Sequence, residues 1–143
     1  MSLFSVMSIG ASGMAAQRTR AEILVENLAN AETTRTPEGG PYRRKDVVFE
    51  TAAVDSPFAS IFDSQVQEGG VAVSGILTDT SDPEKRYMPG HPDADKDGYV
   101  AFPRINPAED MVDLMGAARN YEANVAAISA VKDMIQKSID LMH

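Results

Sequence analysis

The stretch from Asn106 to Met142 carries the longest unbroken periodicity in the chain. Its apolar positions recur at alternating steps of three and four residues, the spacing of a heptad stripe along one face of an α-helix. The stripe consists of Met111, Leu114, Ala118, Tyr121, Val125, Ile128, Lys132, Ile135, Ile139 and Met142, of which only Lys132 is polar. The pattern predicts one continuous helix, and this helix constrains the fold more than any other segment does.

The beginning of this helix is indicated by Asn106, which can cap the first free amides, and by Pro107, which suits the first helical position. At about 1.5 Å per residue the helix is about 50 Å long, which is more than a compact domain of this size needs. It must therefore pack against a partner along its length. Two arrangements satisfy that need: a helix in a small bundle, with the stripe facing the core, or a rod of two paired helices.

The first 30 residues favour the rod, because they carry a second stripe of the same spacing. Its members are Phe4, Met7, Ala11, Met14, Arg18, Ala21, Val25 and Leu28, with Arg18 as the polar member. Gly10 and Gly13 each cost about 1 kcal/mol of helix stability relative to Ala, so this helix should be weak without a partner.

The chain runs out along the first helix and returns along the second, so we expect the two stripes to pair antiparallel. The expected register places Leu28 opposite Met111, Ala21 opposite Ala118, Met14 beside Val125 and Ala11 beside Ile128. In the same register Arg18 should stack on the ring of Tyr121.

The segment between the helices predicts a small β-rich insert. A polar run rich in Gly and Pro, from residue 30 to 41, predicts an extended connection. Strands are predicted at residues 42–51, 70–79, 86–88 and 99–102, with a bulge at Gly75, whereas residues 55–65 are ambiguous. The predicted fold class is α+β: N- and C-terminal helices paired as an antiparallel coiled coil. Residues 1–30 and 107–143 would form the helical domain and 31–106 the insert.

Composition excludes several function classes. The net charge of -8 gives no electrostatic basis for binding nucleic acid. The basic trio Arg43, Arg44 and Lys45 is interpreted as a solvated strand edge. The absence of Cys excludes disulfides and thiolate chemistry, and no apolar run is long enough for a transmembrane helix. The uncharged N-terminal stretch lacks the early basic residue of a cleavable signal peptide, so we expect none.

No motif predicts a catalytic, cofactor or metal site. Residues 93–100 match the first eight positions of an EF-hand calcium loop, but Arg104 occupies the twelfth position, where the motif needs a bidentate Glu. An Asx-rich turn between two strands is therefore the expected structure. Neither His91 nor His143 has a recognisable base or nucleophile nearby in the sequence. We expect no enzyme activity, no cofactor and no small-molecule substrate.

Two motifs resemble one known family. Residues 12–17 and 23–33, with the core Asn27-Leu28-Ala29-Asn30, resemble the N-terminal motif of bacterial flagellar rod and hook proteins, and residues 111–125 resemble the C-terminal helix of that family. Gly40-Pro41-Tyr42-Arg43 and residues 91–95 are most similar to its short proximal-rod subfamily C. The family's motif often continues into Gly-Tyr-Lys, whereas residues 34–37 here are Thr-Arg-Thr-Pro.

The resemblance implies a structural subunit of the proximal rod of the flagellar basal body, assembled helically into the drive shaft that transmits torque. It implies copies of the chain, other rod proteins, basal-body neighbours and the flagellar type III export apparatus as partners. The implied location is the basal body, in the periplasmic part of the rod in a two-membrane cell, reached without a cleaved signal. A weak first helix suits a subunit that travels unfolded and orders on assembly.

Apolar residues outside the stripes should bury against neighbouring subunits and form the inner wall of a tube, with the insert outside. Asn27, Asn30 and Asn124 should fix helix register, or else Asn30 caps a helix and Asn124 faces solvent. The predicted protein-interface residues are Met14, Arg18, Ala21, Ile23, Leu24, Val25, Asn27, Leu28, Asn30, Met111, Val112, Leu114, Met115, Ala118, Tyr121, Asn124, Val125, Ile128, Val131, Met134 and Ile135. The same pattern is also compatible with a soluble coiled-coil module that binds a partner helix.

Overall fold

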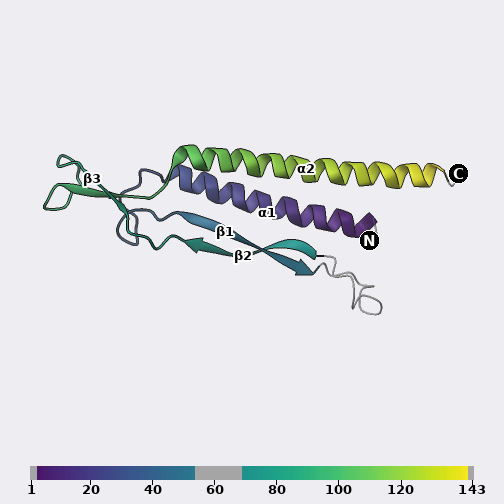
Figure 1. Ribbon diagram of the computed structural model, residues 1–143, viewed down its shortest axis with the longest axis horizontal. Helices are drawn as coiled ribbons and strands as arrows, with labels where there is room; N and C mark the ends of the chain where they lie inside the picture. Colours follow the sequence, from purple (N-terminus) through teal and green to yellow (C-terminus); the bar gives the residue numbers. More distant parts are fainter. Residues whose placement is uncertain (1–2, 54–68, 142–143) are drawn as a thin grey trace.

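The computed structural model describes residues 3–53 and 69–141. Within them, helix α1 (Leu3–Ala29) and helix α2 (Pro107–Asp140) lie side by side and antiparallel, with the N- and C-terminal ends of the chain at the same end of the pair (Figure 1). The ambiguous residues 55–65 and the last member of the predicted α2 stripe, Met142, lie outside the described residues. No helix within them is apolar over a length sufficient to span a bilayer.

The beginning of α2 has the predicted cap. The Asn106 side chain accepts a hydrogen bond from the Ala108 N–H at 3.2 Å, and Pro107 occupies the first turn. Proline has no backbone N–H that would be left unsatisfied at that position. Asn106 and Pro107 therefore stabilise the start of α2 without the loss of a backbone hydrogen bond. Glu109 and Asp110 add negative charge at the same end.

The stripe of α2 that faces α1 differs by one residue from the predicted stripe. Asp110, Ala117 and Val131 are buried, whereas the predicted stripe members Met111, Ala118, Tyr121, Val125 and Lys132 are exposed. Leu114, Ile128 and Ile135 belong to both stripes and are partly buried. The prediction was wrong here because α2 carries apolar or alanine residues on several faces, so periodicity alone could not choose between adjacent stripes. A regular coiled coil stays a prediction.

Small residues, rather than large ones, bring the two helices together. A Cβ built on Gly10 would lie 3.0 Å from Ile128 Cγ1, and one built on Gly13 would lie 3.0 Å from Asn124 Nδ2. The two glycines therefore allow a close approach that any larger residue would disturb, which offsets their cost to the helix. The contact between Gly10 and Ile128 lies within one residue of the predicted register.

The first hairpin lies along α1, on the side away from α2 (Figure 1). Strand β1 (Lys45–Ala53) pairs antiparallel with β2 (Gly69–Thr78). The register shifts where Val48 faces Gly75 and Phe49 faces Val73, which leaves Ser74 as the extra residue and confirms a bulge next to Gly75. The division into a helical domain and an insert stays a prediction, since the hairpin packs directly on α1.

The second hairpin lies beyond the end of the helix pair where α1 ends and α2 begins (Figure 1). Strand β3 (Glu84–Tyr87) pairs with β4 (Tyr99–Phe102), and the turn between them contains the calcium-like motif. Asp95 Oδ1 accepts the N–H groups of Asp97 at 2.9 Å and Tyr99 at 2.8 Å, the geometry of an Asx turn. Among the described residues no three acidic, His or Cys side chains form a metal-binding group.

Replacing Gly10 by Val should destabilise the helix pair, because the branched side chain would collide with Ile128. We expect a loss of about 1–3 kcal/mol, measured by far-UV circular dichroism during thermal unfolding of the dilute chain. Gly116→Ala is the matched control. Gly116 has nothing within 4 Å of a built Cβ, so alanine should raise stability by about 1 kcal/mol. Equal or greater stability of Gly10→Val would contradict the close packing.

Candidate subunit interface

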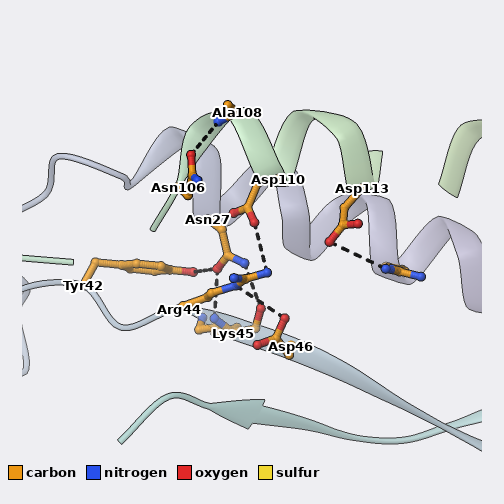
Figure 2. Close-up of polar contacts among 10 residues, drawn as sticks. Asn27, Tyr42, Arg44, Lys45, Asp46, Asn106, Ala108, Asp110 and Asp113 are labelled. Carbon is orange, nitrogen blue, oxygen red and sulfur yellow. Dashed lines mark hydrogen bonds and ion pairs between the residues drawn. The ribbon is translucent and has the colours of Figure 1, made fainter. Parts of the chain in front are cut away.

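The buried side chain of Asn27 joins the end of α1 to the beginning of β1 (Figure 2). Its Nδ2 donates to the Lys45 carbonyl at 2.8 Å, and its Oδ1 accepts from the Lys45 N–H at 2.9 Å. The Tyr42 hydroxyl donates to the same Oδ1 at 3.1 Å. The amide thus satisfies both backbone groups of one residue, which fixes the point at which the chain enters the strand.

Tyr42 lies beside this amide and contacts it through its hydroxyl. Its side chain is buried, and desolvation together with the nearby carboxylate of Glu26 raises the pKa of Tyr42 to about 12. The hydroxyl therefore remains protonated at neutral pH and can act as a hydrogen-bond donor. Lys45 Nζ lies 2.6 Å from Glu26 Oε1 and 5.6 Å from the centre of the Tyr42 ring. Glu26, Asn27, Tyr42 and Lys45 therefore form one polar network beside the last turn of α1.

A second contact ties α2 into the same junction. Arg44 Nη2 lies 3.1 Å from Asp110 Oδ1, and Arg44 Nε lies 3.5 Å from Asp46 Oδ1 (Figure 2). The Asp110 side chain is fully buried, and neither of its oxygens has a well-directed hydrogen bond within the described residues. One guanidinium is therefore shared between two carboxylates. The start of α2 is held to the segment before β1 by this charge pair.

Burial, the largest effect, raises the pKa of Asp110 above its usual value. The Arg44 guanidinium opposes the shift, and the negative charges of Asp46, Asp113 and Glu109 add to it. Asp113 is itself paired, since Arg20 Nη2 lies 3.8 Å from Asp113 Oδ2. The ionised form of Asp110 therefore opposes folding of the isolated chain at neutral pH.

The other two singled-out asparagines have different roles. Asn30 Nδ2 donates to the Glu26 carbonyl at 2.9 Å, and its Oδ1 accepts from Thr33 Oγ1 at 3.1 Å, so Asn30 caps the end of α1. Asn124 is partly buried against Gly13 in the helix pair. The capping alternative thus holds for Asn30, whereas solvent exposure does not hold for Asn124.

The interpretation of the basic trio as a solvated strand edge was wrong for Arg44 and Lys45, which are partly buried, whereas Arg43 is exposed. Arg44 pairs with Asp110, Lys45 pairs with Glu26, and Arg43 Nη1 donates to the Asp79 carbonyl at 3.1 Å. Sequence reasoning therefore missed Arg44, Lys45 and Asp110 as a group. One signal in the sequence was the position of Asp110, an acidic residue in the first turn of α2, four residues after its cap.

The structure separates the predicted interface residues into three groups. Four are buried within the chain, namely Ile23, Leu24, Asn27 and Val131. Eight are partly buried: Met14, Ala21, Leu28, Asn30, Leu114, Asn124, Ile128 and Ile135. Nine are exposed: Arg18, Val25, Met111, Val112, Met115, Ala118, Tyr121, Val125 and Met134.

Two details of the expected contacts were wrong. Ile23 and Leu24 were expected to face neighbouring subunits but are buried within the chain, because α1 lies between α2 and the first hairpin. Val131 is buried likewise, on the stripe that faces α1. Arg18 does not stack on Tyr121, since its Nε donates to Glu22 Oε1 at 2.9 Å, one helical turn later on the same face.

Comparison with known proteins shows which family this chain belongs to. A family model described as flagellar basal body rod FlgEFG protein C-terminal matches residues 96–141. The chain is 38% identical over 153 residues to the flagellar basal-body rod protein FlgC of Borreliella burgdorferi, covering 100% of this chain and 99% of that protein. It is 40% identical to FlgC of Bacillus subtilis, with 99% of each chain covered. FlgC of Salmonella typhimurium is 36% identical, covering 99% of this chain and 98% of the relative.

The chain belongs to the FlgC family of flagellar basal-body rod proteins. It is therefore a structural subunit of the flagellar basal-body rod. The polar junction accordingly positions helices rather than reacting groups. The FlgC family also accounts for the exposed apolar side chains, since a subunit that assembles with rod components needs uncovered surface.

Replacing Asn27 by Ala should release β1 from α1 in this rod subunit. Three hydrogen bonds are lost, and the Lys45 backbone and Tyr42 hydroxyl remain partly buried, so we expect a loss of about 2–4 kcal/mol in unfolding free energy. Urea unfolding of the dilute chain measures this. Asn120→Ala, at an exposed position of α2, is the control and should change stability by about 0.5 kcal/mol or less. A loss no larger than that of the control would show that the amide does not hold the strand.

The raised pKa of Asp110 predicts the direction of a pH effect. The unfolded carboxyl has its ordinary pKa, so acidification from about pH 7 to about pH 4.5 removes the unfavourable charge from the folded state first. Wild type should therefore gain stability relative to Asp110→Asn as the pH falls, measured as the difference between their urea midpoints. Asp133→Asn changes an exposed acid on the same helix, and its urea midpoint should change with pH as that of wild type does. A loss of wild-type stability relative to Asp110→Asn on acidification would mean that the pKa of Asp110 is lowered by folding.

Proposed function

We propose that this chain is a subunit of the proximal rod whose paired helices pack side by side with copies of itself and other rod proteins. The helices would form the wall of a tube, the hairpins would lie outside it, and torque would pass through laterally packed helices. The observation that carries this proposal is the apolar surface of α2. Val112 is 68% exposed, Met115 57%, Met111 53% and Met134 50%. A helix that is apolar outside its own core-facing stripe needs a further partner.

The total surface supports the same proposal. The chain exposes 10314 Å², whereas a compact monomer of its mass exposes about 7200 Å². An elongated chain with this much surface gains more by packing against neighbours than by remaining a monomer.

The core of the single chain is small. Its buried apolar side chains in the described residues are Ala16, Ile23, Leu24, Tyr42, Val100, Phe102, Ala117 and Val131. A two-stranded hairpin is marginal by itself, so the hairpin on α1 depends on the order of the helix. We infer that the chain is only weakly folded before assembly, which suits export in an unfolded state through the flagellar type III apparatus and incorporation in the periplasmic part of the rod.

No catalytic step is part of this proposal. Its relatives are rod proteins, and the junction around Asn27 and Asp110 consists of contacts between elements of the chain. The function would reside in the stiffness and complementarity of the helices. Nucleic acid and small-molecule substrates have no place in it.

Hydrogen exchange on the purified, dilute chain tests the proposal. We expect the protection factors of α1, the first hairpin and α2 to be at least about a hundredfold lower in the dilute chain than in purified basal bodies. The hairpin should lose its protection together with α1, because it packs on that helix.

The alternative, a soluble coiled-coil module that binds a partner helix, predicts another result. Such a module would show strong protection of both helices in a discrete monomer or dimer at low concentration. That outcome, together with absence of the chain from basal bodies, would reject the rod assignment of the helices.

A further inference from the structure

One row of residues on α1 is covered by neither α2 nor the first hairpin. Its end members are large and apolar, with Phe4 75% exposed and Val25 50% exposed. Between them the side chains of Arg18 and Glu22 are 76% and 59% exposed. The row repeats at steps of three and four residues, and we call it the α1 row. Its members are Phe4, Ser8, Ala11, Ala15, Arg18, Glu22 and Val25.

A matching row lies on α2. It begins two residues after the buried stripe that starts at Asp110, which places it about 200° around the helix and therefore on the side away from α1. Val112 is 68% exposed, and the row contains the glycine with open space described above. The members of this α2 row are Val112, Gly116, Arg119, Ala123, Ala126 and Ala130.

The two rows are complementary when the helices run antiparallel. If Val25 is placed opposite Gly116, the shared spacing places Glu22 opposite Arg119 and Ala15 opposite Ala126. The carboxylate of Glu22 thus lies opposite the guanidinium of Arg119, and Val25 lies opposite Gly116, which has no side chain. The register also brings Arg18 beside Glu122, which gives a second pair of opposite charges.

Neither contact is made inside one chain. α1 faces its own α2 through Gly10 and Gly13, and no acidic side chain among the described residues lies within ion-pair distance of Arg119. Gly116 costs α2 about 1 kcal/mol relative to alanine, and no contact in its own chain requires it. Both features are explained if another copy supplies the missing partner.

We propose that the α1 row of one copy packs antiparallel on the α2 row of a second copy, with Val25 seated over Gly116 and Glu22 paired with Arg119. The inference rests on the proposed function and names its partner as this same chain. The two rows differ, so the contact is heterologous: each copy uses one row and leaves the other free. The same contact therefore repeats from copy to copy, and adjacent copies have the same polarity.

A charge exchange tests the ion pair in the native bacterium, with the variant genes replacing the chromosomal copy. Arg119→Glu and Glu22→Arg should each lower the amount of the chain in purified basal bodies by about tenfold, and the double exchange should restore it to within about twofold of wild type. Lys132→Glu changes an exposed cation of α2 outside the row and should incorporate normally. Normal incorporation of both single variants, or failure of the double variant to recover while its circular dichroism matches wild type, overturns the pairing.

Cysteine cross-linking tests the partner independently, because the natural chain has no Cys. Ala15→Cys and Ala126→Cys, expressed on separate copies in one cell, should give an oxidised band of twice the chain mass from basal bodies. Ala15→Cys with Ala118→Cys, an exposed position off the row, should not.

A band of another mass would mean that a different rod protein occupies the row, and no band would mean that the rows do not meet; either result rejects the second copy. These failures are distinct from failure of the proposed function. If a strain lacking the chain still builds complete rods, the rod role itself is wrong, whatever the cross-links show.

Discussion

The arrangement of the whole chain depends on the buried amide of Asn27. It binds both backbone groups of Lys45 and the Tyr42 hydroxyl, so the end of α1, the connection and the start of β1 are fixed relative to one another. The first hairpin can follow α1 only if β1 leaves the junction at this point. The Arg44–Asp110 pair then adds α2 to the same place. Three segments far apart in sequence are thus joined by polar contacts at one end of the helix pair (Figure 2).

This junction and the helix pair contribute in different ways. The helices pack through small residues and bury few large side chains, so their association in one chain is weak. The junction is specific in geometry, but burial of the Asp110 carboxyl beside one shared cation costs desolvation energy, which limits what the pair adds to stability. Specificity of arrangement and marginal stability therefore occur together. That combination suits a rod subunit that completes its packing with neighbours.

Much of the fold could be predicted from sequence because it depends on local signals. The cap at Asn106, the two long helices, the bulge near Gly75 and the Asx turn at Asp95 all follow from short-range preferences. The stripe of α2 could not be chosen, since alanine on several faces satisfies more than one heptad. The position of the hairpin against Ile23 and Leu24 could not be predicted either, because periodicity does not tell which element covers a face.

The polar junction was missed for a related reason. Arg43, Arg44 and Lys45 form a basic run that is usually solvated, and their partners lie far away in sequence at Asp79, Asp110 and Glu26. Among the residues of the junction, only Asn27 was expected to make a specific hydrogen bond, and its partner is the start of a strand in its own chain.

The position of α1 between α2 and the first hairpin has a mechanical consequence. α2 and the hairpin make no direct contact within the described residues, so a bending load on α2 reaches the hairpin only through α1 or through the junction. Apolar surfaces resist separation but permit small sliding, whereas the directed bonds of the junction resist both. The two helices and the first hairpin can therefore slide slightly against one another along their length, while the junction holds them together at one end.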